Sequence, residues 1–242
     1  MTWFILPGWG LPPKDYEKLA GLLGPDTRTL DSWKVPLTAD TDDIRAELGA
    51  LDSPKVDLLG HSLGGLAAIE WALRRPDQVR QLVLIDPTAP DEVPSRFHVE
   101  GKLRRGMDKL AGAAVEALWR VGPQIRRWGI RQTTGSEDAL PIDEARARYG
   151  TRENSRRLAE QLSASWAHAA RVDALLDAGA ARRRSLAPLL LVGAGNGKQR
   201  RFLRSQWDLG RKLHARTIML TGQNHVFPLT RPDLVVRHIE NL

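Results

Sequence analysis

One stretch of the chain, residues 55–71 (KVDLLGHSLGGLAAIEW), constrains the fold more than any other. It opens with a short apolar run, turns around Ser62 and continues with helix-forming residues, an order that predicts a buried strand, a sharp turn and a helix. Gly60 and Gly64 stand two residues before and after Ser62, where side chains at a tight turn would collide with the neighbouring strand or helix. The motif therefore predicts that Ser62 projects from the carboxyl end of a strand, with the amide of Leu63 at a helix N-terminus.

Strand and helix patterns alternate on both sides of this motif. Short apolar runs predict strands at residues 3–6, 27–35, 79–85, 186–192 and 216–220. Helical periodicity is expected over residues 14–23, 40–51 and 231–242. The spacing from Val56 to Ile85 fits one right-handed parallel crossover. The pattern predicts an α/β fold with a mostly parallel central sheet flanked by helices.

The segment from residue 94 to residue 185 interrupts this alternation. It shows no strand pattern and predicts helices around residues 99–121, 143–149 and 152–176. We expect an all-helical cap over residues 94–185, inserted into a core made of residues 1–93 and 186–242.

The net charge of +7 is concentrated in the same segment. Residues 94–185 hold 18 Lys or Arg and 11 Asp or Glu, so the whole excess lies there. Two interpretations stay open, an arginine-rich solvated surface and a basic face for an anionic partner. Nucleic acid is disfavoured as that partner, because the chain carries no recognised binding motif and no interleaving of aromatic and basic residues.

Composition excludes several other classes. With no cysteine, the chain has neither a disulfide framework nor a thiolate zinc site, and no sequence feature implies another metal or a cofactor. Residues 1–10 lack the basic start of a signal peptide, and no apolar run approaches the roughly 20 residues of a membrane span. We expect a cytoplasmic protein without a membrane span.

A serine hydroxyl is a poor nucleophile and needs a base within hydrogen-bond reach. His225 follows the last predicted strand, in a loop before the final helix, where it is placed for that role. We expect His61 to point away from the site. The positions of the other histidines favour surface roles: His98, His168, His214 and His238.

Three segments, residues 7–10, 60–65 and 222–228, carry a resemblance to a known family. The chain resembles the α/β-hydrolases, and among them the small carboxylesterases similar to pimeloyl-[acyl-carrier protein] methyl ester esterase. The resemblance implies a Ser62–His225 pair and an oxyanion hole made by the amides of Trp9 and Leu63. Pro7 stands where the family usually has histidine, a departure that matters little because the donor is a backbone amide.

The third member of the triad departs from the family pattern. The usual acid follows the penultimate strand, where this chain has the amide Asn196. An amide orients an imidazole but cannot stabilise imidazolium by charge. Three readings stay open: Asp86, at the end of the strand beside the nucleophile strand, is the acid; Asn196 serves in an altered triad; or the chain is a degenerate hydrolase that only binds ligand.

The resemblance implies cleavage of a small-molecule carboxylic ester or thioester through an acyl-enzyme, with no cofactor. It also suggests an acyl chain presented on an acidic acyl carrier protein, as in biotin synthesis. A cofactorless C–C lyase or synthase on the same fold is the alternative. The candidate carrier or substrate contacts are the basic residues Lys102, Arg104, Arg105, Arg126, Arg127, Arg152, Arg156 and Arg157.

Overall fold

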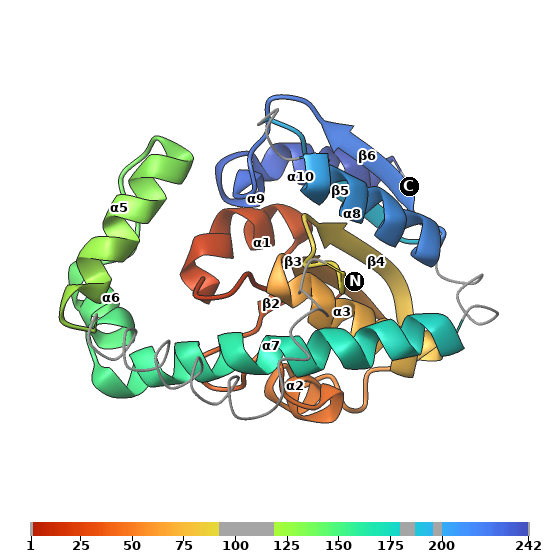
Figure 1. Ribbon diagram of the computed structural model, residues 1–242, viewed down its shortest axis with the longest axis horizontal. Helices are drawn as coiled ribbons and strands as arrows, with labels where there is room; N and C mark the ends of the chain where they lie inside the picture. Colours follow the sequence, from red (N-terminus) through yellow and green to blue (C-terminus); the bar gives the residue numbers. More distant parts are fainter. Residues whose placement is uncertain (1, 92–118, 180–186, 196–199, 242) are drawn as a thin grey trace.

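A single six-stranded sheet organises the protein (Figure 1). The computed structural model describes residues 2–91, 119–179, 187–195 and 200–241. Its strands lie in the order β2-β1-β3-β4-β5-β6, and every neighbouring pair is parallel. They are β1 (Trp3–Leu6), β2 (Arg28–Thr29), β3 (Val56–His61), β4 (Val79–Ile85), β5 (Leu189–Gly193) and β6 (Arg216–Leu220). The predicted α/β fold with a parallel sheet is confirmed.

Helices cover both faces of the sheet, which explains the continuous apolar runs of its strands. In β1, Trp3 and Ile5 pack into one core, whereas Phe4 and Leu6 pack into the other. The first core is closed by α1 (Glu17–Leu23), α9 (Phe227–Thr230) and α10 (Pro232–Glu240). The second is closed by α2 (Thr41–Glu47), α3 (Leu63–Arg74), α7 (Arg152–Ala178) and α8 (Arg200–Leu213).

The described residues between β4 and β5 contain helices and no strand. After a 3₁₀ turn at Trp119–Val121 come α5 (Gly122–Thr134), α6 (Ile142–Tyr149) and α7. Figure 1 shows α7 running along one side of the molecule, with α6 and α5 rising from one of its ends. The division into a core of residues 1–93 and 186–242 and a cap of residues 94–185 stays a prediction.

Three elements differ from the predicted ones. The strand expected over residues 27–35 is only Arg28–Thr29, at the edge of the sheet, because the chain turns at residues 32–34, where the amide of Lys34 donates to the carbonyl of Asp31. The helix expected around residues 99–121 falls almost wholly outside the described residues, and the helix that is described, α5, begins at Gly122. Helix α8 was not predicted.

A buried carboxylate joins α7 to α3, the helix that follows Ser62. Glu70 is 4% exposed, and its Oε2 lies 2.7 Å from Nε2 of His168. Its Oε1 lies 2.8 Å from Nη2 of Arg74. The expectation that His168 is a surface residue is wrong, since it is fully buried in this contact. Burial raises the pKa of Glu70, but hydrogen bonds from His168 and Arg74 outweigh burial and lower it to about 2.

A second buried ion pair fixes α5 to the core. The guanidinium of Arg126 lies 2.7 Å from Asp15, beside α1, and 2.8 Å from Asp138. It also donates to the hydroxyl of Tyr149 in α6, at 2.9 Å. Two carboxylates and a hydroxyl around one cation offset the cost of its burial, which a single partner often does not.

We predict that Glu70→Gln lowers the free energy of unfolding at pH 7 by about 2–3 kcal/mol, because it removes a carboxylate whose folded pKa is depressed. The stabilisation by Glu70 is fully present above its unfolded pKa, near 4.5, and is lost as the pH falls from there towards 2. The difference in the free energy of unfolding between the variant and the wild type, measured by urea titration, should therefore shrink as the pH falls over that range. Glu160→Gln is the control, since its ion pair with Arg156 is exposed and should contribute nothing measurable.

Candidate active site

The turn that carries Ser62 is strained and leaves no room for side chains beside it. Ser62 has φ +53° and ψ −123°, a conformation unfavourable for any residue other than glycine. A Cβ on Gly60 would lie 2.6 Å from Cα of Gly65, and one on Gly65 would lie 2.5 Å from Cβ of Pro87. One on Gly64 would overlap the backbone of β1. The predicted strand, sharp turn and helix are confirmed, with the glycines where close approach requires them.

Asp86 and His225 meet at the carboxyl edge of the sheet. Asp86 follows β4, the neighbour of β3, and its Oδ2 lies 3.4 Å from Nδ1 of His225. That separation is longer than a well-formed hydrogen bond and is an electrostatic contact. The carboxylate is 1% exposed, whereas the His225 side chain is 47% exposed. The pair therefore has a buried acid behind an accessible imidazole.

Gly193, at the end of β5, makes room for this carboxylate. Its amide donates to Oδ1 of Asp86 at 2.8 Å, and a Cβ there would lie 3.0 Å from Oδ2. Burial raises the pKa of Asp86, while the interaction with His225 and the bond from Gly193 act in the opposite direction. This role of Gly193 was not predicted from the sequence, although a glycine at the end of a strand often marks a close approach.

Backbone contacts hold His225 beside the Ser62 turn. The carbonyl of His225 lies 2.8 Å from Nε2 of His61, the residue before Ser62. The two imidazole rings are 5.0 Å apart, centre to centre. His61 is fully buried and faces Tyr16 in the core. The structure thus brings three of the predicted site residues, Ser62, Asp86 and His225, to one edge of the sheet.

The loop after β1 contacts the helices that follow β4 in the chain. The indole of Trp9 donates to the carbonyl of Leu158 in α7 at 2.9 Å, and the hydroxyl of Tyr149 donates to the carbonyl of Gly10 at 2.7 Å. On the core side, the amide of Gly8 donates to the hydroxyl of Tyr16 at 2.8 Å. The turn expected to supply one oxyanion amide is therefore held from two sides.

The remaining predicted residues have different outcomes. Arg126 is 8% exposed and enclosed by its ion pairs, so its assignment as a carrier contact is wrong. Arg157 donates to Glu153 and to the carbonyl of Trp33. The side chains of Arg127, Arg152 and Arg156 are exposed. Four residues, Asn196, Lys102, Arg104 and Arg105, lie outside the described residues.

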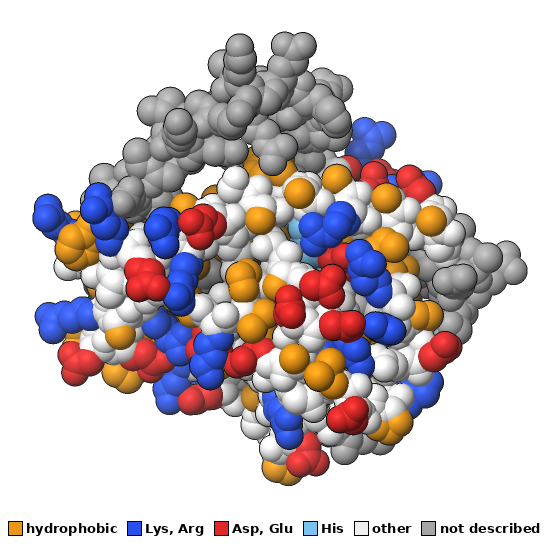
Figure 2. Space-filling view, turned by 90° about the horizontal axis from the view of Figure 1, so that it is seen from below, with side chains coloured by type: hydrophobic (Ala, Val, Ile, Leu, Met, Phe, Trp, Pro, Cys, Tyr) orange, Lys and Arg blue, Asp and Glu red, His pale blue; other side chains and the backbone are white. Residues whose placement is uncertain are grey.

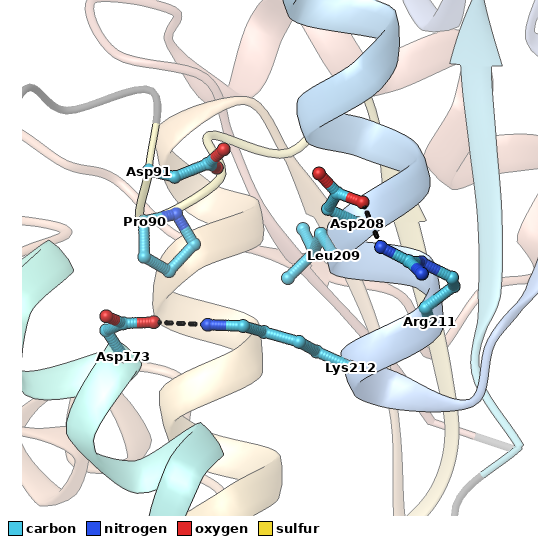
Figure 3. A pocket seen from close by; sticks show the side chains of 7 residues that line it. All are labelled: Pro90, Asp91, Asp173, Asp208, Leu209, Arg211 and Lys212. Atoms are coloured by element: carbon cyan, nitrogen blue, oxygen red, sulfur yellow. Dashed lines mark hydrogen bonds and ion pairs between the residues drawn. The ribbon is translucent and has the colours of Figure 1, made fainter.

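A hollow of about 460 Å³ lies away from this site, between α8, α7 and the segment after β4 (Figure 3). Its charges are already paired: Lys212 lies 2.8 Å from Asp173, and Arg211 lies 2.5 Å from Asp208. None of the candidate catalytic residues lines it. Its lining residues are Pro90, Asp91, Asp173, Asp208, Leu209, Arg211 and Lys212.

One face of the molecule carries mixed charge. Figure 2 shows a face on which Lys and Arg lie among Asp and Glu instead of forming one large basic patch. Within the described ranges, no group of three or more His, Asp or Glu residues is arranged to hold a metal ion. In the same part of the chain, no helix has both the length and the apolarity needed to cross a bilayer.

A sequence profile of the alpha/beta hydrolase family matches residues 4–238, and the chain belongs to that family. It is 32% identical over 123 residues to the pimeloyl-[acyl-carrier protein] methyl ester esterase of Neisseria meningitidis serogroup C, covering 46% of this chain and 45% of that protein. It is 50% identical over 34 residues to a bovine (lyso)-N-acylphosphatidylethanolamine lipase, covering 14% of this chain and 10% of the lipase. The chain thus matches less than half the length of either relative.

Solved structures agree on the fold. An esterase from Thermogutta terrifontis superposes with a TM-score of 0.63 at 16% identity, covering 100% of this chain and 88% of that one. A loop variant of the haloalkane dehalogenase DbeA from Bradyrhizobium elkanii gives 0.64 at 18% identity, covering 99% and 88%. At these identities the likeness establishes the fold alone.

We predict that Gly64→Ala lowers the free energy of unfolding by about 2–4 kcal/mol, because its Cβ would overlap the backbone of Leu6 in β1. Gly21→Ala is the matched control: it lies in α1 with open space around its Cα, so alanine should stabilise the helix by about 0.5–1 kcal/mol. Urea unfolding of both variants checks the contrast. Equal effects would contradict the packing of the turn.

Proposed function

We propose that this protein is a serine hydrolase that cleaves a carboxylic ester or thioester through an acyl-enzyme on Ser62. The observation that carries the proposal is the contact between His225 and the buried Asp86, beside a strained turn that presents Ser62. The curated match to a methyl ester esterase supports the same class of substrate.

In this mechanism His225 removes the proton of Ser62 as the serine oxygen attacks the carbonyl carbon. The amides of Trp9 and Leu63 stabilise the oxyanion, and His225 returns the proton to the leaving alcohol or thiol. Water, activated by the same imidazole, then attacks the acyl-enzyme and releases the carboxylic acid. Asp86 holds the imidazole through Nδ1 and stabilises the imidazolium that forms in both steps.

Geometry supports Asp86 as the acid of the triad. Its carboxylate faces Nδ1 of His225, and the amide of Gly193 binds its other oxygen, so one oxygen is oriented towards the imidazole. A negative charge there stabilises imidazolium, which an amide such as Asn196 does not. A cofactorless lyase would also use Ser62 and His225, but it would form no acyl-enzyme. Burst kinetics with a chromogenic ester distinguish the two, because only an acyl-enzyme gives a burst.

We predict that Asp86→Asn lowers kcat by about 10³–10⁴-fold, the scale of the same change in serine proteases, while leaving KM nearly unchanged. Ser62→Ala should abolish both ester turnover and labelling by a fluorophosphonate, read by intact mass. Asp77→Asn, an exposed carboxylate before β4, is the control and should retain wild-type kcat. An unchanged kcat in Asp86→Asn would contradict the assignment of Asp86 and indicate that another residue is the acid.

We further propose that an acidic acyl carrier protein presents the acyl chain, with Arg127, Arg152 and Arg156 as its contacts. The support is the exposure of these three arginines, together with the similarity to an esterase whose name specifies a carrier-bound ester. Arg127 has no acidic partner among the described residues, whereas Arg156 pairs with Glu160 at 3.5 Å. The alternative to a carrier-bound ester is a free small ester, which requires no protein partner.

We predict that Arg127→Glu combined with Arg156→Glu raises KM for a carrier-bound ester by about 3–10-fold at low salt and leaves kcat/KM for a small chromogenic ester unchanged. The effect should fade in about 0.5 M salt because the charges are screened. Arg211→Glu combined with Arg237→Glu, in α8 and α10, is the control for net charge, because it also reverses two exposed arginines. Equal losses with both substrates would contradict a carrier contact.

A further inference from the structure

A chain of three hydrogen bonds crosses the core behind the candidate site. The amide of Gly8 donates to the hydroxyl of Tyr16 at 2.8 Å, and that hydroxyl lies 2.6 Å from Nδ1 of His61. Nε2 of His61 lies 2.8 Å from the carbonyl of His225. The chain thus begins in the turn that carries Trp9, passes the residue before Ser62 and ends on the backbone of the proposed base.

The chemistry of the groups fixes the direction of every bond in this chain. A carbonyl only accepts, so Nε2 of His61 must carry a hydrogen and donate to His225. Burial is the main cause that lowers the pKa of His61 to about 3, and the nearby His225 contributes in the same direction. The ring is therefore neutral at pH 7, and its Nδ1 is an acceptor. The hydroxyl of Tyr16 therefore donates to Nδ1 while it accepts from Gly8.

Both side chains are sealed from water. Tyr16 and His61 are each 0% exposed, and burial raises the pKa of Tyr16 far above its ordinary value, so its hydroxyl keeps its proton. No solvent is available to replace a lost partner, and each group in the chain has one arrangement that satisfies its neighbours. If the Tyr16 hydroxyl were removed, Nε2 of His61 would still have to donate to the His225 carbonyl, but Nδ1 of His61 and the amide of Gly8 would both be left buried without a partner.

We propose that Tyr16 and His61 are positioning residues, whose hydrogen-bonded chain holds His225 in register with the Ser62 turn and the oxyanion amides. The inference rests on the proposed function, in which His225 is the base. Neither side chain touches the reacting atoms. Their role is to fix the separation between three segments that are far apart in the sequence, because an error of about 1 Å between reacting groups costs on the order of 100-fold in rate.

The test replaces the hydroxyl and measures catalysis and tautomer together. Tyr16→Phe should lower kcat for a small chromogenic ester by about 10–100-fold, with KM changed by less than about two-fold. Nitrogen NMR of protein labelled in its histidine rings should show the Nε2–H tautomer of His61 in the wild type, and Tyr16→Phe should move the Nδ1 resonance downfield because that nitrogen loses its hydrogen-bond donor. His61→Gln, which keeps an N–H near the position of Nε2, should retain more activity than His61→Leu.

Leu19→Val controls for lost stability, because Leu19 is fully buried in the same core as Tyr16 but takes part in none of the three hydrogen bonds. It should keep wild-type kcat even if its midpoint of unfolding falls as far as that of Tyr16→Phe. If fluorophosphonate labels Ser62 in the wild type but Tyr16→Phe keeps the wild-type kcat, the positioning role alone is overturned. An Nδ1–H tautomer of His61 in the wild type overturns it as well. Absence of labelling in the wild type overturns the proposed function, and the inference with it.

Discussion

The structure depends on how closely the chain approaches itself around Ser62. Three glycines let α3 lie against β1, β3 and the residue after Asp86, at separations that a single Cβ would prevent. The parallel pairing of β3 with β4, in which His61 lies opposite Ile85, brings the carboxylate of Asp86 to the same edge as Ser62. The positive φ of Ser62 is the energetic cost of that arrangement, and the buried hydrogen bonds of both neighbouring strands offset it.

Much of the core could be predicted because its strands are buried on both faces and therefore appear as unbroken apolar runs. The edge strand β2 could not, since Arg28 and Thr29 carry no such signal and the apolar residues that follow leave the sheet. Helix α8 was not predicted, although its buried residues Ser205, Leu209 and Leu213 recur at helical spacing. Helix α5 begins at Gly122-Pro123, and a proline in the first turn is a helix start signal. The expected helix over residues 99–121 ended directly before it, and no separate helix was predicted there.

The candidate site was partly predictable for the same reason. Ser62 and His225 sit in motifs whose neighbouring residues dictate local geometry, and Asp86 could be placed from the order of strands alone. No local pattern could reveal that the hydroxyl of Tyr16 reaches His61 from 45 positions away, or that Gly193 leaves space for a carboxylate. Arg126 was wrongly assigned as a surface contact because the sequence shows its charge but not its partner. That partner, Asp15, pairs with it from 111 positions away in the sequence.

The helices after β4 do more than cover the sheet, because Trp9 and Gly10 are bound by Leu158 and Tyr149. An engineer who exchanged this helical segment for that of another hydrolase, in order to change the substrate, would also remove two of the supports of the turn beside β1. Grafts that keep a carbonyl opposite the indole and a phenol opposite the Gly10 carbonyl should preserve turnover. Grafts that omit these two contacts should lose rate.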